Sequence, residues 1–260
     1  MSATTAPTSA LGGRAGHGPV SFSPTYLALD VRRSLRNRRT LIFLVVIPPA
    51  FFLLFGGGYR HSDPDAFAYV MVSMAVYGAM IATTSTGAQV SVERSQGWTR
   101  QLRLTPLRPF GYVLTKVASA LVLGVVPVVM VLVAGGFLGV DLSLAQWLKV
   151  AALSWVCSLV FAAFGLFVGY LVPAENAMQF IGPLLGLMSF FGGLFEPLNM
   201  MPQALQNLAP WMPTYGVGLV ARSPLTGSGL TLLHVGDLVL WTVIFSFGTA
   251  LLFRRDTSRV

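Results

Sequence analysis

Long uncharged runs separated by short charged segments extend over most of this chain, and their lengths predict membrane spans. A helix of about 20 apolar residues crosses the hydrocarbon core of a bilayer. Six segments have this character once the apolar residues that flank the shorter ones are included. We therefore predict six transmembrane helices, over residues 40–59, 66–92, 112–138, 147–172, 177–195 and 232–253.

The segment before the first span has a different pattern. Residues 1–22 are rich in small and polar residues and predict a disordered tail. Beyond them, Leu27, Val31 and Leu35 recur every four residues opposite several arginines, which predicts an amphipathic helix on the membrane surface. Ser23 followed by Pro24 suits the N-cap and first position of that helix. The arginines of this membrane-interface helix are Arg32, Arg33, Arg36, Arg38 and Arg39.

Residues 197–221 are also uncharged, but their composition argues against a seventh span. Four prolines and several amide side chains would leave polar groups unsatisfied in lipid. These prolines are Pro197, Pro202, Pro210 and Pro213. We expect an outer re-entrant loop with one or two short helices before the sixth span.

Composition and charge support this topology. Only 10% of the 260 residues are charged and 54% are hydrophobic, whereas about 25% of residues are charged in soluble domains. With both termini in the cytoplasm, fourteen of the 17 Lys and Arg residues lie on the inner side, as the positive-inside rule requires. The net charge of +8 thus reflects membrane topology and not nucleic-acid binding. We predict a multi-pass protein of the cytoplasmic (inner) membrane of a bacterium.

The inner loop between the second and third spans is the most informative stretch. Its residues from Trp98 to Leu104 predict a short helix, which ends at the Thr105–Pro106 step because the residue before a proline avoids helical geometry. A short helix on the cytoplasmic side provides a surface on which a soluble partner can dock.

This loop resembles the coupling-helix region of the ABC transporter type 2 permeases. The resemblance rests on the acidic-basic pair Glu93–Arg94, on Gly97, on a short helix ending Leu-x-x-Thr-Pro-Leu, and on Tyr112 and Lys116 at the start of the next span. The surface helix, the Pro48-Pro49 pair, the six spans and the outer loop extend it over residues 24–255. The chain is most similar to the daunorubicin-resistance and multidrug branch, although it has Arg100 or Gln101 where family members often carry Glu.

The resemblance implies an all-α membrane domain over residues 23–255 and a cytoplasmic tail over 256–260. It also implies two copies of an ATP-binding subunit, a second permease chain (identical or related) and contact with the lipid bilayer, without nucleic acid. The residues it assigns to coupling with the ATPase are Glu93, Arg94, Gly97, Trp98, Arg100, Gln101, Leu102, Thr105 and Pro106.

The chain itself carries no phosphate-binding loop. Such a loop needs a Gly-Lys step, and the only two lysines follow Thr115 and Leu148. We therefore expect ATP and Mg²⁺ on the partner subunit, no cofactor or metal in this chain, and a transport subunit that is not itself an enzyme.

The predicted function is export of an apolar or amphiphilic substrate such as a drug, an antibiotic or a lipid. The alternatives are an ion-gradient-driven secondary transporter or channel and, within the family, a polysaccharide or glycolipid exporter. A polar run near the inner end of span two supplies pathway candidates, Thr83, Thr84, Thr86 and Gln89. Two G-x-x-x-G pairs, Gly165 with Gly169 and Gly182 with Gly186, favour close helix packing within the chain over a dimer seam.

Overall fold

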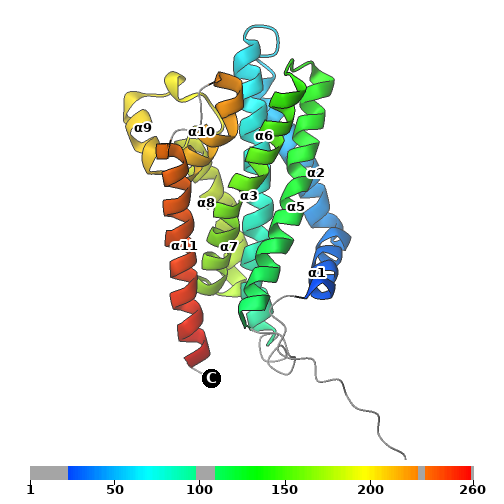
Figure 1. The fold of residues 1–260 in the computed structure, drawn as a ribbon, viewed down its shortest axis with the longest axis vertical. Coiled ribbons are helices and arrows are strands. Elements are labelled where there is room, and N and C mark those ends of the chain that lie inside the picture. The colour runs from blue at the N-terminus through cyan, green and yellow to red at the C-terminus, as the bar shows by residue number, and fades with distance from the viewer. Residues whose placement is uncertain (1–22, 98–108, 228–231, 259–260) are drawn as a thin grey trace, which may run out of the picture.

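The computed structural model describes residues 23–97, 109–227 and 232–258, which contain helices and no strand (Figure 1). The predicted tail over residues 1–22 lies outside the described residues, as does the predicted coupling helix between Trp98 and Leu104. The helices are α1 (Pro24–Arg36), α2 (Arg38–Gly56), α3 (Pro64–Ser95), α5 (Pro109–Leu138), α6 (Leu144–Cys157), α7 (Leu159–Leu171), α8 (Ala174–Phe191), η1 (Leu198–Met200), α9 (Gln203–Leu208), η2 (Ala209–Trp211), α10 (Pro213–Thr226) and α11 (Leu232–Ser258).

Among the described residues, five helical segments are long and apolar enough to cross a membrane. They are Arg38–Gly56, Pro64–Ser95, Phe110–Leu138, Leu144–Leu171 and Leu232–Arg255. Each coincides with one of the predicted spans. The predicted span 177–195 falls on α8, whose apolar part, Gln179–Phe191, is shorter than the other five. The protein is thus a multi-pass membrane protein, and the sixth crossing stays a prediction.

The fourth span departs from the single helix expected over residues 147–172. It consists of α6 and α7, which meet at Ser158. There the Ser158 amide donates to the carbonyl of Trp155, three residues back, and the Ser158 hydroxyl donates to the same carbonyl at 2.6 Å. A serine hydroxyl that competes for a backbone carbonyl disturbs the helical ladder without any proline or glycine.

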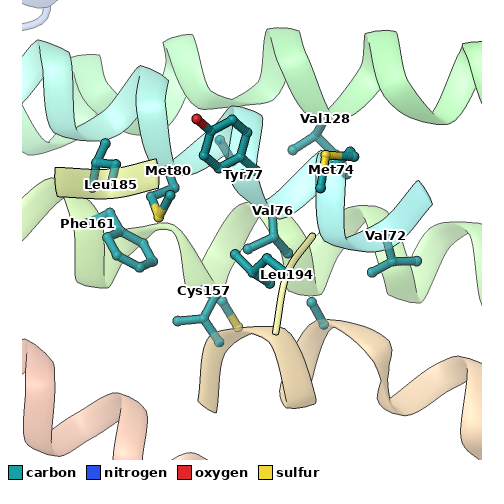
Figure 2. Close-up of a cluster of buried hydrophobic side chains, with 14 of the residues drawn as sticks. Val72, Met74, Val76, Tyr77, Met80, Val128, Cys157, Phe161, Leu185 and Leu194 are labelled. Carbon is teal, nitrogen blue, oxygen red and sulfur yellow. The ribbon is translucent and has the colours of Figure 1, made fainter. Parts of the chain in front are cut away.

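Helix α3 lies at the centre of the bundle and packs against α2, α5, α7, α8 and α10. Its side chains supply much of the apolar core, in which Met80 of α3 lies close to Phe161 of α7 and Leu185 of α8 (Figure 2). The free thiol of Cys157 is buried in the same cluster. Helix α3 is not amphipathic: it is apolar and buried on nearly all sides.

Small residues allow α3 and α7 to approach closely. A Cβ atom added at Gly165 would lie 2.3 Å from the backbone oxygen of Thr84, and one added at Gly87 would lie 2.7 Å from the Leu166 nitrogen. The prediction that Gly165 and Gly169 serve packing within the chain is confirmed. At Gly182 and Gly186 of α8 an added Cβ would meet nothing within 4 Å.

The segment predicted as a loop with short helices contains η1, α9, η2 and α10, none of which is long enough to span. The prediction of short helices is confirmed, with α10 continuing to Thr226. Arg222 fixes α10 to α3: its buried guanidinium donates to the Ser73 hydroxyl at 2.9 Å and lies 4.2 Å from the centre of the Tyr69 ring.

The ends of the helices fall into two groups (Figure 1). Helix α1, the end of α3, the start of α5 and the C-terminal end of α11 lie at one end of the bundle, which we call the basal end. The turn between α2 and α3 lies at the opposite end, with α9 and α10 in the same half of the bundle. Among the described residues, the first helix, the last helix end and the two helix ends that flank the predicted loop therefore share one end of the bundle, and the placement of that end in the cytoplasm stays a prediction.

Candidate functional site

The basal end contains the residues that flank the predicted coupling helix. Helix α3 ends at Ser95 and α5 begins at Pro109, so both helices border the segment 98–108. Glu93, Arg94 and Gly97 are therefore described. The other residues assigned to coupling lie outside the described residues, and their roles stay predictions: Trp98, Arg100, Gln101, Leu102, Thr105 and Pro106.

Gly97 directs the chain out of α3. Its φ angle is +72°, in the left-handed region, and its amide donates to the Arg94 carbonyl at 3.0 Å. Glycine adopts this conformation without the steric cost that a Cβ atom brings, which is why it commonly follows helix ends. The sequence position of Gly97 thus defines where the helix stops and the loop begins.

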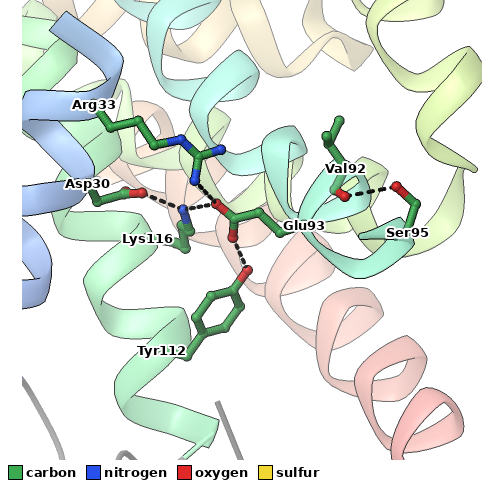
Figure 3. Close-up of polar contacts among 7 residues, drawn as sticks. All are labelled: Asp30, Arg33, Val92, Glu93, Ser95, Tyr112 and Lys116. Carbon is green, nitrogen blue, oxygen red and sulfur yellow. Dashed lines mark hydrogen bonds and ion pairs between the residues drawn. The ribbon is translucent and has the colours of Figure 1, made fainter. Parts of the chain in front are cut away.

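Three charged side chains from three helices meet in a buried cluster next to this exit (Figure 3). The Lys116 ammonium of α5 donates to Asp30 Oδ1 of α1 at 2.7 Å and to Glu93 Oε1 of α3 at 2.7 Å. All three residues are buried. Charged groups removed from water are tolerated when they are paired and hydrogen-bonded, so each member of this cluster depends on the others.

Two further side chains complete the cluster. The Tyr112 hydroxyl, one turn before Lys116 on α5, donates to Glu93 Oε2 at 2.6 Å. Arg33 Nη1 lies 3.6 Å from Glu93 Oε1, with 58% of its side chain exposed. Both oxygens of Glu93 are therefore occupied, and this carboxylate holds α3 against α1 and α5 at once. We call Asp30, Arg33, Glu93, Tyr112 and Lys116 the ion cluster.

Arg94, the neighbour of Glu93 in the sequence, connects α3 to α7. Its Nη1 atom donates to the carbonyls of Gly169 and Tyr170, both at 3.2 Å, and its guanidinium lies 5.1 Å from the centre of the Tyr170 ring. These carbonyls belong to the last turn of α7, where unpaired carbonyls and the helix dipole favour a cation. The final turn of α3 is thus fixed to α1, α5 and α7 by two adjacent residues.

Sequence reasoning selected Glu93, Arg94, Tyr112 and Lys116 but missed Asp30. It predicted a helix that lies on the membrane surface through Leu27, Val31 and Leu35, and gave no role to Asp30 and Ser34, which are the buried residues of that helix. Asp30 is the only acidic residue between residues 1 and 62. The signal in the sequence that could have indicated the Asp30–Lys116 pair was a single acidic residue among many arginines, together with a lysine one turn inside a span.

The arginines predicted to lie at the membrane interface are exposed and divided between two helices. Arg32, Arg33 and Arg36 belong to α1, while Arg38 and Arg39 begin α2. Asn37 separates the two helices. It caps α2, because its side chain accepts a hydrogen bond from the Thr40 amide. The predicted N-cap of α1 is confirmed, since the Ser23 side chain accepts from the Tyr26 amide at 3.3 Å.

The pathway candidates lie in the middle of α3. Thr83, Thr84 and Thr86 are buried, and their hydroxyls donate to backbone carbonyls; that of Thr84 reaches the Phe161 carbonyl of α7 at 3.2 Å. Gln89 is half-buried. Their role in a transport pathway stays a prediction.

Comparison with known proteins agrees with this architecture. Residues 25–220 match the family model described as "ABC-2 type transporter". The chain is also similar to a protein of Bacillus subtilis (strain 168) named "Putative transport permease YvfS", with 27% identity over 221 residues that cover 83% of this chain and 90% of that protein. The family match covers well over half of the chain, so this protein belongs to the ABC-2 type transporter family, as the membrane subunit of an ABC transporter.

Proposed function

We propose that this subunit exports an apolar or amphiphilic substrate, such as a drug, an antibiotic or a lipid, across the cytoplasmic membrane. Two copies of the ATP-binding subunit that the family implies dock at the basal end, beneath two permease chains. ATP and Mg²⁺ are held by those subunits. Their closure displaces the segment 98–108, and the displacement shifts the spans toward an outward-open arrangement.

The observation that carries this proposal is the double attachment of the final turn of α3. Glu93 connects that turn to Arg33 of α1 and to α5, and Arg94 connects it to α7. A force applied to the segment 98–108 therefore acts on a turn that is bonded to three other helices. A connector that served only to join two spans would need none of these contacts.

Reconstitution tests direction and substrate together. The chain and its ATP-binding subunit are incorporated into vesicles with the basal end outward, and amphiphilic drugs, lipids and glycolipids are compared as stimulators of ATP hydrolysis. We expect ATP-dependent accumulation of amphiphilic compounds inside the vesicles. Stimulation by lipid-linked sugars alone would favour the polysaccharide or glycolipid exporter. Transport by the isolated chain, driven by an ion gradient, would replace the proposal with a secondary transporter or channel.

A substitution at Gly97 tests whether movement of the segment 98–108 is transmitted to the final turn of α3 and the helices bonded to it, which we call the coupling route. Gly97→Ala adds a Cβ atom that meets nothing within 4 Å, so its effect comes from the left-handed backbone alone, at about 1–2 kcal/mol. We expect ATP hydrolysis to continue while transport per ATP falls. Gly58→Ala is the matched control, because Gly58 also has open space but lacks a positive φ and lies between α2 and α3. Equal transport per ATP in both variants and the wild type would contradict the coupling route.

A further inference from the structure

Helix α1 presents two faces of different chemistry. Its buried face carries Asp30 and Ser34 and meets the bundle through the ion cluster. Its apolar stripe does not pack into the protein core: Leu27 and Val31 are only half-buried, and Leu35 is 40% exposed. An apolar stripe that the chain leaves open is expected to be covered by another apolar material.

The open stripe forms one wall of a groove between α1 and α5. The groove has a volume of about 500 Å³ and is lined by Leu27, Val31 and Leu35 of α1 and by Val122 of α5. Val122 is 44% exposed and belongs to a membrane-spanning helix, so the groove borders the region of the lipid chains. Nearly all of its lining surface is apolar.

Two positively charged side chains lie at the edge of this groove. Arg32 and Arg36 line it, are exposed, and are four residues apart on one helix, so their side chains lie on the same face. Neither makes a hydrogen bond or an ion pair with any residue that the structure describes. A guanidinium group matches the geometry of a phosphate, with two parallel N–H donors.

We propose that an anionic phospholipid binds in this groove, with its phosphate held by Arg32 and Arg36 and an acyl chain lying along Val31 and Val122. Only a molecule with a negative head and an apolar tail satisfies both parts of the groove, and the adjoining leaflet supplies such molecules. The bound lipid clamps α1 to α5 from the side opposite Asp30. It therefore stabilises the attachment that the ion cluster makes from within.

Lipid retention tests the site directly. The chain is purified in detergent without its ATP-binding subunit, supplied with phosphatidylglycerol or phosphatidylcholine, and examined by native mass spectrometry. We expect one retained phosphatidylglycerol per chain and at least tenfold less phosphatidylcholine. Arg32→Gln with Arg36→Gln removes this preference. Equal retention of the two lipids by the wild type would overturn the proposal.

Two further variants separate a built site from general attraction of lipid to cations. Arg38→Gln with Arg39→Gln removes the same charge from exposed residues at the start of α2 that do not line the groove, and we expect retention to be unchanged. Val122→Trp fills the groove from an exposed position without altering charge, and we expect at least a tenfold loss. A loss in the first variant equal to that of Arg32→Gln with Arg36→Gln, or full retention in Val122→Trp, would refute the site. Since no ATP is involved, either result is independent of the export proposal.

Discussion

Replacing Lys116 with methionine is the sharpest test of the ion cluster. Methionine keeps a similar length and volume but removes the ammonium group, so Asp30 and Glu93 lose the cation that they share. Each carboxylate is then left in a buried position, and Asp30 retains no described partner, because its other oxygen has none. The two negative charges then face each other with only the half-exposed Arg33, beside Glu93, to offset them.

The expected loss of stability in Lys116→Met follows from the two distances between the Lys116 ammonium group and the carboxylates. At 2.7 Å and an effective dielectric constant of about 20, each contact between Lys116 and a carboxylate is worth about 6 kcal/mol before desolvation. The cost of desolvating three ions offsets most of this gain, but removal of one partner leaves that cost in place, so the loss is about 3–5 kcal/mol. For a chain of this size, this lowers the unfolding temperature by about 6–20 °C.

Thermal unfolding in detergent, with size-exclusion chromatography as the readout of folded protein, measures this shift in unfolding temperature. Lys149→Met is the matched control, because it removes the only other lysine, which is exposed on α6. The triple variant Lys116→Met, Asp30→Asn, Glu93→Gln should recover part of the stability, since it removes the uncompensated charges. If Lys116→Met unfolds within about 2 °C of the wild type, the cluster contributes less than 1 kcal/mol and the reasoning fails.

Two other predictions concern the neighbours of α3. Gly165→Ala places a Cβ atom 2.3 Å from the Thr84 backbone oxygen and should destabilise the protein by about 1–3 kcal/mol, whereas Gly186→Ala, which meets nothing, should not lower the unfolding temperature. Arg94→Gln loses the charged hydrogen bonds to the end of α7, each worth about 1.5–3 kcal/mol, and should lower both the unfolding temperature and the transport per ATP. Unchanged transport per ATP in Arg94→Gln would remove α7 from the coupling route.

The spans were predictable because a bilayer imposes a local rule on the sequence. An uncharged run of sufficient length is visible without knowledge of any partner, and five such runs coincide with helices of spanning length. The interruption at Ser158 was not predictable in this way. Serine is common in membrane helices, and whether its hydroxyl breaks the helical ladder depends on the local backbone.

The candidate site was predictable only in part. The resemblance of the loop selected Glu93, Arg94 and Gly97, which the structure places at the end of α3. The partner of Lys116 could not be found from spacing, because Asp30 is 86 residues away and lies on a helix that was predicted to rest on the membrane surface. Long-range pairing of charges becomes visible only when the helices are placed together.

The ion cluster also bears on how the chain is assembled during synthesis. Asp30 and Glu93 are made before Lys116, so the lysine that they share is not yet in place when α1 and the base of α3 are synthesised. Until α5 follows, α1 has no buried ionic contact to hold it to the bundle, and Glu93 at the base of α3 has only the exposed Arg33 as a cation. The arrival of α5 therefore sets the earliest moment at which the basal end can adopt its final arrangement, and a chain truncated before Lys116 should leave α1 accessible to proteases.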